Sequence, residues 1–186
     1  MKEIKSICVF CGAQDTIEDK YKKLAYKIGE KIAERGITLI YGGAKAGVMR
    51  SLAKGASENG GEVVAVYPTF FHHRHVFESE VTKIIDVPDL AERKKIMIDM
   101  ADAFLTLPGG FGTLDEVFEV LTGYTLYYDF QKPFILYNQD GYWDHLKAII
   151  NHAIKLRFVK PKSGLPIHYA ESFEEIFKKI DKLRGE

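Results

Sequence analysis

Residues 103–121 read AFLTLPGGFGTLDEVFEVL, and this stretch decides the fold. Residues 103–107 have the length and the apolar composition of a buried β-strand. A proline and three glycines follow within positions 108–112 and break the strand. One face of the helix that comes next is predicted to carry Leu114, Val117, Phe118 and Leu121. The stretch therefore predicts a strand, a tight loop and an amphipathic helix, which is the repeating unit of a parallel α/β sheet.

Short apolar runs alternate with helical patterns in the rest of the chain as well. Further strands are predicted at residues 6–11, 37–41, 62–67, 81–87 and 133–137. Helices are predicted between them, one stopping at Gly36, one reaching about Asn59 and one over residues 90–101, and two more complete the chain. We therefore expect a single domain over residues 1–186, a three-layer α/β/α fold with a mostly parallel sheet of about six to seven strands.

Charged side chains balance in this chain, since 26 are basic and 26 are acidic. Because its net charge is zero, the molecule as a whole is not attracted to nucleic acid or to an anionic membrane, and we expect neither as a partner. The N-terminus is charged (MKEIK), and the apolar run after it is too short for a signal peptide or a membrane span. We expect a cytoplasmic protein that binds any anion through a local site.

Two patterns invite a metal or redox interpretation. Cys8 and Cys11 form a C-x-x-C within an apolar run, but a zinc site needs further ligands and no second C-x-x-C is present. Three histidines lie in the FHHRH segment at residues 71–75, where no carboxylate or cysteine has the spacing of a formed site. We interpret the cysteines as core residues and the histidine segment as an exposed polar loop, and we expect no metal.

Three loops that contain glycine follow predicted strands. Their candidate binding residues are Gly12, then Gly42 and Gly43, then Gly109, Gly110, Gly112 and Thr113. The carboxyl ends of parallel strands share one edge, and such sheets bind ligands there. In the third loop the glycines let the backbone approach a ligand, and the helix start offers free N–H groups to an anion. The spacing from Thr113 to Glu116 fits a capping box equally well, so the loop alone leaves both interpretations open.

Two basic residues lie on the inward side of the helix predicted over residues 90–101, whose N-cap is Asp89. Stepping 100° per residue gives this helix an apolar arc made of Leu90, Ile96, Met97, Met100 and Ala101. Arg93 lies inside the arc, and Lys94 lies on its flank. An unpaired buried charge is costly, so Arg93 needs a partner, either a carboxylate at the core edge or a bound ligand.

The helix after the glycine loop carries a candidate catalytic carboxylate. Glu116 is predicted to lie opposite the helix face formed by Leu114, Val117 and Leu121. Side chains lean toward a helix N-terminus, so its carboxylate is expected to project back over the loop and to face a cleft.

Aromatic residues gather where this helix ends. Tyr124, Tyr127, Tyr128 and Phe130 spread around the helix more widely than one stripe. Such a spread predicts a helix-packed homodimer interface rather than core packing alone.

Five motifs resemble those of the Lonely Guy (LOG) family in their order and spacing. They are FCG at residues 10–12, YGG at 41–43, RKxxM at 93–97, ADAF at 101–104 and PGGxGTxxE at 108–116. The resemblance continues through the Lys-Pro pair at 132–133 and the Gly-Tyr pair at 141–142, and it fades toward the C-terminus. Proteins of this type are often labelled lysine decarboxylases.

The resemblance implies a cytokinin riboside 5′-monophosphate phosphoribohydrolase, a homodimer with a Rossmann-like fold. Such enzymes cleave the N-glycosidic bond of an N6-modified adenosine monophosphate and release free base and ribose 5-phosphate. The family's catalytic arginine and glutamate correspond to Arg93 and Glu116, and its phosphate loop corresponds to residues 109–113. We hypothesise that Glu116 stabilises an oxocarbenium-like state and orients water, while Arg93 fixes the geometry and Lys94 is a further substrate-binding candidate.

The decarboxylase label fits the residues poorly. Pyridoxal phosphate chemistry needs a Schiff-base lysine, and no lysine is marked out for that role, so we expect no cofactor. Ala44 and Arg50 stand where the family usually has glycine, which leaves open whether the base is a cytokinin or plain adenine. A non-catalytic nucleotide or cofactor carrier of the same fold is the alternative, and it would not need both Arg93 and Glu116.

Overall fold

Seven short strands form the sheet in the computed structural model, which describes residues 4–70, 81–127, 130–160 and 165–184. The strands are β1 (Ser6–Phe10), β2 (Thr38–Tyr41), β3 (Val63–Pro68), β4 (Lys83–Val87), β5 (Ala103–Thr106), β6 (Phe134–Tyr137) and β7 (Ile167–Ala170). All neighbouring strands are parallel, in the order β4-β3-β2-β1-β5-β6-β7. The predicted α/β class is confirmed.

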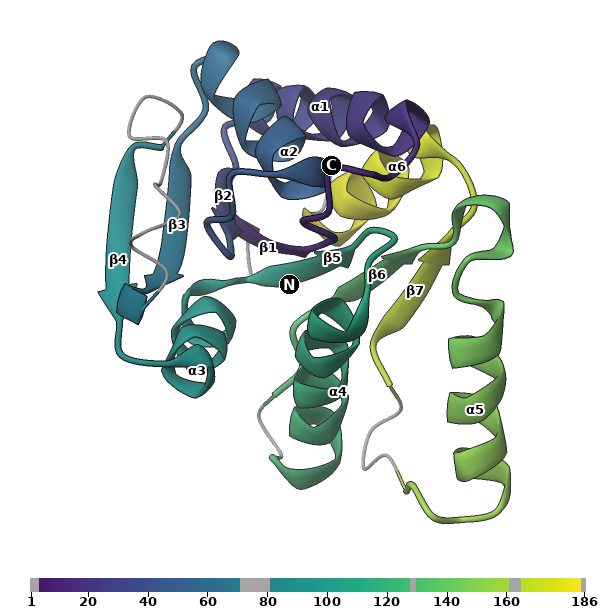
Figure 1. Cartoon of the computed structure of the whole chain (residues 1–186). Coiled ribbons are helices and arrows are strands. Elements are labelled where there is room, and N and C mark those ends of the chain that lie inside the picture. The colour runs from purple at the N-terminus through teal and green to yellow at the C-terminus, as the bar shows by residue number, and fades with distance from the viewer. Residues whose placement is uncertain (1–3, 71–80, 128–129, 161–164, 185–186) are drawn as a thin grey trace.

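Helices cover both faces of the sheet. They are α1 (Asp19–Glu34), α2 (Gly47–Glu58), α3 (Leu90–Met100), α4 (Phe111–Leu126), α5 (Asp144–Lys155) and α6 (Phe173–Arg184), and a 3-10 turn, η3, spans Gln139–Gly141. Figure 1 shows α1, α2 and α6 above the sheet and α3, α4 and α5 below it. None of the helices in the described ranges is long and apolar enough to cross a membrane.

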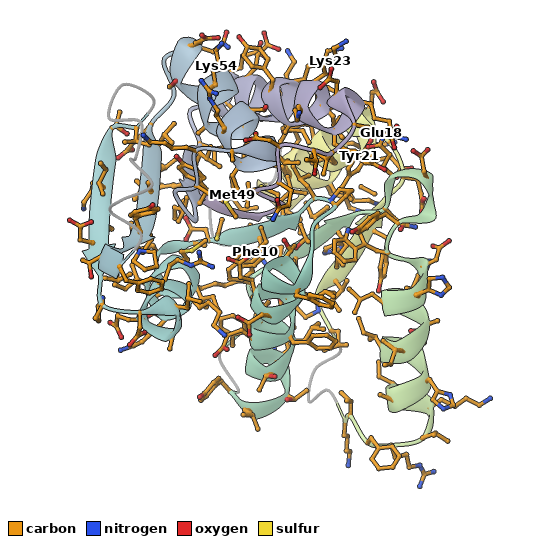
Figure 2. The ribbon with its side chains drawn as sticks, viewed as in Figure 1. Phe10, Glu18, Tyr21, Lys23, Met49 and Lys54 are labelled. Atoms are coloured by element: carbon orange, nitrogen blue, oxygen red, sulfur yellow. The ribbon has the colours of Figure 1, made fainter. Side chains whose placement is uncertain are left out.

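Alternation along the central strand divides the core into two halves. From β1, Ile7 and Val9 pack under α1, α2 and α6, whereas Cys8 and Phe10 pack against the layer of α3, α4 and α5. Phe10 reaches into that second layer beside α4 (Figure 2) and stacks on Phe104 with the ring centroids 5.8 Å apart. The inner strands β1, β2, β3, β5 and β6 are apolar on both sides because both of their faces are covered.

The strand order reverses beside β1. The chain moves outward from β1 through β2 and β3 to β4, and then returns to place β5 against the other side of β1. The loops that follow β1 and β5 start side by side at the carboxyl edge of the sheet. One leads to α1 above the sheet and the other leads to α4 below it. This is the topological switch point at which parallel sheets of this kind bind ligands.

One strand was not predicted from the sequence. β7 pairs with β6 at the edge of the sheet, and its sequence Ile-His-Tyr-Ala is half-buried at the first three positions. An edge strand of four residues with a histidine and a tyrosine has no continuous apolar run, so its pattern is weak.

Candidate active site

The three predicted loops meet at the carboxyl edge of β1, β2 and β5. The Gly12 amide donates a hydrogen bond to the Pro108 carbonyl at 3.3 Å, and the Met49 amide donates to the Gly12 carbonyl at 3.1 Å. Asp15 supports the junction, since its Oδ1 accepts from the Gly47 amide at 2.8 Å. These bonds join the loop after β1 to both of its neighbours, as parallel pairing predicts.

The glycine loop ends in an uncapped helix start. Gly110 is the N-cap of α4, and no side chain of the described residues caps the helix there. The capping box is therefore not formed: Thr113 lies inside the helix, against Gly109, where an added Cβ would come within 2.1 Å of its Oγ1. Gly110 and Gly112 are exposed. The amides of the first turn need acceptors, which an anion supplies.

Arg93 on α3 points inward and pairs with Glu116 on α4. Its Nη2 lies 2.8 Å from Oε1 of Glu116, and the two side chains are 13% and 1% exposed. The loop after β2 makes room for the guanidinium, because a Cβ on Gly42 would stand only 3.3 Å from Nη1 of Arg93. Three segments that are distant in sequence thus enclose one buried ion pair.

Glu116 was predicted to lie opposite the apolar face of α4, away from the core, and this placement was wrong. The buried side of α4 includes Thr113, Glu116, Val120 and Tyr124, so the carboxylate lies within the inward stripe and not opposite it. Phe118, which the sequence pattern placed on the apolar face, is 46% exposed. Apolar residues lie on more than one face of α4, so the apolar pattern alone does not identify which face of the helix is buried.

The apolar arc of α3 is also narrower than predicted. Within α3 Met97 is the only buried residue, and Ala101 directly after the helix is buried as well, whereas Leu90 and Met100 are 42% and 36% exposed. Below the sheet, α3 has α4 on one side of it (Figure 1), so only the part of its surface that faces the sheet and α4 is covered. The predicted N-cap is confirmed, since Oδ1 of Asp89 accepts from the Glu92 amide at 2.8 Å.

Burial controls the electrostatics of the pair. It raises the pKa of Glu116 from 4.5 to about 7, against the opposing effect of Arg93 and with a further increase from Asp115. Oε2 of Glu116 and Nε of Arg93 are buried and have no hydrogen-bond partner among the described residues. Buried polar atoms in native proteins are nearly always satisfied, so these two are well suited to a bound ligand or a water molecule.

Lys94 lies beside the pair on α3. Its Nζ is 2.8 Å from Oδ1 of Asp115 and 3.0 Å from Oε2 of Glu119, both on α4. Burial alone would lower the pKa of Lys94, but the two carboxylates outweigh it and raise the pKa. This arrangement favours a structural role for Lys94, in which it holds α3 against α4. It is less suited to the predicted contact with substrate.

Several other residues singled out from the sequence lie in the core or outside the described residues. Cys8 and Cys11 are free and buried in opposite halves of the core, as expected for core residues. Tyr124 is also buried, and its hydroxyl donates to the Lys132 carbonyl at 2.6 Å. The histidine segment at 71–75 and Tyr128 lie outside the described residues. In the ranges that are described, no group of three or more metal-ligating side chains gathers.

Sequence reasoning missed two residues that shape the loops. Asp15 caps the start of α2, and Tyr142 donates from its hydroxyl to the Gly109 carbonyl at 2.7 Å. The Gly-Tyr pair at 141–142 belongs to the family resemblance, but the motif does not predict this contact. A side chain that bonds a backbone atom 33 positions away leaves no spacing pattern in the sequence.

Comparison with known proteins places the site motifs within a matched region. The family model described as "Possible lysine decarboxylase" matches residues 49–180. A cytokinin riboside 5′-monophosphate phosphoribohydrolase of Arabidopsis thaliana is 35% identical over 179 residues, covering 96% of this chain and 84% of that protein. A probable enzyme of the same name from Oryza sativa subsp. japonica is 35% identical over 178 residues, with 96% and 72% covered.

Solved structures with the same architecture include cofactor-binding proteins. The molybdenum cofactor binding protein of the phototrophic bacterium Rippkaea orientalis superposes with a TM-score of 0.75 at 26% identity, over 98% of both chains. The molybdenum cofactor carrier protein of Chlamydomonas reinhardtii gives a TM-score of 0.76 at 22% identity over the full length of both chains, a likeness of fold. The Rossmann-like expectation is confirmed.

Proposed function

Because the chain belongs to the Lonely Guy family of cytokinin riboside 5′-monophosphate phosphoribohydrolases, we propose that it hydrolyses the N-glycosidic bond of a nucleoside 5′-monophosphate. The products are a free base and ribose 5-phosphate, and the substrate is a cytokinin-type N6-modified AMP or AMP itself. The observation that carries the proposal is the buried pair of Arg93 and Glu116 beside an uncapped helix start.

The glycine loop holds the 5′-phosphate in this proposal. The free amides at the start of α4 bind the phosphate oxygens and the helix dipole favours their charge. Gly12, Gly42 and Gly43 line the neighbouring loops. Binding of this remote group fixes the ribose so that its C1′ lies near the carboxylate.

Glu116 acts at the bond that breaks. As C1′ loses the base, positive charge develops on the ribose ring, and the Glu116 carboxylate stabilises it. A water molecule adds its oxygen to C1′, and one of its protons passes through Oε2 to the departing nitrogen of the base. A pKa of about 7 suits a group that must both accept and return a proton near neutral pH. Arg93 orients the carboxylate.

The rival function is that of a carrier. The full-length likeness to the Rippkaea orientalis protein favours it, because that protein's name describes binding and not turnover. A carrier needs the anion loop, but it gains nothing from an ionisable carboxylate buried at 1% exposure. Burial of an ionisable carboxylate is costly, and buried ionisable groups with shifted pKa values are found most often in active sites. We therefore favour the hydrolase.

The test is direct. Purified protein is incubated with AMP and with isopentenyladenosine 5′-monophosphate, and free base and ribose 5-phosphate are quantified. Glu116→Gln and Arg93→Ala should each lower base release by about two orders of magnitude or more while the fold survives. Glu119→Gln is the matched control, since it makes the same change on the same helix at a carboxylate that is 52% exposed. Near-normal turnover in Glu116→Gln would refute the assignment.

We also propose a homodimer, with α4 and α5 at the interface. Tyr124 is in the core, but Phe118, Leu126 and Ile149 on these two helices and Tyr127 directly after α4 are 46%, 60%, 58% and 66% exposed. An apolar groove of about 300 Å³ lies between them. Clustered exposed apolar side chains of this kind mark association surfaces.

A further inference from the structure

Tyr142 connects the glycine loop to a segment that follows β6. Its hydroxyl donates to the Gly109 carbonyl at 2.7 Å, and its ring is 44% exposed. A half-exposed tyrosine contributes little to the core, so its hydrogen bond to the loop is the feature that needs an explanation.

The backbone before Tyr142 is held in an uncommon conformation. Asp140 and Gly141 both have positive φ, 53° and 72°. A non-glycine residue persists there only where surrounding contacts determine it. Asn138 supplies them: its Oδ1 accepts from the Trp143 amide at 2.7 Å, and its Nδ2 donates to Oδ1 of Asp144 at 2.9 Å.

The tyrosine ring is also fixed. It packs edge-on against Trp143 with the centroids 4.8 Å apart, and Trp143 is itself only 3% exposed. The turn and the ring contact together place the hydroxyl at the glycine loop.

The hydrogen bond decides which way one peptide group faces. Among the described residues every peptide bond is trans, so the Gly109 carbonyl and the Gly110 N–H point in opposite directions. A peptide between two glycines has little intrinsic preference for either orientation. With its carbonyl drawn to Tyr142, this peptide directs the Gly110 amide to the other side of the loop. The reversed peptide would present a carbonyl oxygen there, which repels phosphate.

We propose that Tyr142 is a positioning residue that holds the Gly109–Gly110 peptide in its anion-binding orientation. It thereby sets the affinity of the site for a phosphate monoester without touching the bond that breaks. The inference rests on the proposed function in taking residues 108–113 as the phosphate site, but it does not depend on hydrolysis.

Tyr142→Phe tests this, because the ring and its contact with Trp143 remain. The dissociation constant for ribose 5-phosphate, measured by isothermal titration calorimetry, should rise about three- to tenfold, the range for one neutral hydrogen bond. KM for AMP should rise by the same factor with kcat within about twofold. Base release from adenosine, which has no phosphate, should not change.

Tyr26→Phe is the matched control. It removes one tyrosine hydroxyl, which donates to Glu58 at 2.8 Å between α1 and α2, and it should leave all these constants unchanged. Matching melting temperatures would show that both variants keep the fold.

The outcomes separate the two proposals. An unchanged affinity for ribose 5-phosphate in Tyr142→Phe, or no affinity in the wild type, overturns the positioning role. A fall in kcat with equal effects on AMP and adenosine also overturns it, because Tyr142 would then act at the reacting centre. Weaker ribose 5-phosphate binding in a protein that releases no base supports the positioning role and rejects the hydrolase.

Discussion

Glu116 holds a position in α4 that packing alone would give to an apolar residue. It lies between Thr113 and Val120 in the buried stripe of the helix and is 1% exposed. The charged form is disfavoured there, and the pKa of about 7 expresses that cost. Glu116, to which we assign the catalytic role, therefore lowers the stability of the fold when it is charged.

This cost predicts a pH-dependent stability. Between pH 4.5 and about 7 the folded chain holds the Glu116 proton more tightly than the unfolded chain, so the free energy of unfolding falls as pH rises through this window. Glutamine has no proton to lose. Urea unfolding should therefore show Glu116→Gln more stable than wild type by up to about 3 kcal/mol at pH 8, and by less than about 1 kcal/mol at pH 5.

Equal stability of the two proteins at both pH values would show that Arg93 fully compensates the buried charge. Glu119→Gln, at an exposed site, should follow the wild type throughout.

At the scale of elements, α3 and α4 are joined by two adjacent basic residues. Arg93 and Lys94 pair with Glu116 inside the contact and with Asp115 and Glu119 outside it. The inner pair is buried, whereas the outer carboxylates are 56% and 52% exposed. Solvent screening makes the outer pairs worth little in stability, so their effect is on the alignment of the helices.

Lys94→Met separates alignment from substrate binding. Methionine keeps most of the apolar stem, and the free energy of unfolding should fall by less than about 1 kcal/mol. If Lys94 only holds the helices, KM for AMP should stay within about threefold of wild type, whereas a lost phosphate contact should raise it more than about tenfold. Lys95→Met, at a neighbouring side chain that is 67% exposed, is the control.

At the scale of the whole molecule, the five inner strands of the sheet were predicted because they are covered on both faces, and the edge strand β4 was predicted from its short apolar run although it is only partly buried. The continuous apolar runs of the inner strands are a direct result of burial, and the half-buried edge strand β7 lacks one. The meeting of the three loops was predictable, because parallel strands place their carboxyl ends at one edge.

The details of the site were less accessible from the sequence. The inward side of α4 was misjudged because Phe118 is apolar yet exposed, while Glu116 is charged yet buried. The bond from Tyr142 to Gly109 depends on where the β6–α5 connection folds back, which only the tertiary structure determines.

The proposed dimer is tested by its mass in solution. Phe118→Asp places a charge on the exposed apolar surface of α4, and burying it at an interface would be costly. Light scattering after size exclusion should give twice the mass of one chain for wild type and a single-chain mass for the variant. Lys23→Asp, on the outer surface of α1 (Figure 2), should stay dimeric. A wild type that elutes as a monomer at all concentrations would contradict the proposal.

The two buried cysteines have a practical consequence. Cys8 is covered by α3, α4 and α5, and Cys11 by α1, α2 and α6, so each helical layer shields one thiol. Burial raises the pKa of both thiols, as does the charge of Glu116, which keeps them unreactive while the layers are closed. An alkylating reagent would reach each sulfur only when its own layer opens. The alkylation rates of Cys8 and Cys11 would therefore report separately on the opening of the two halves of the core.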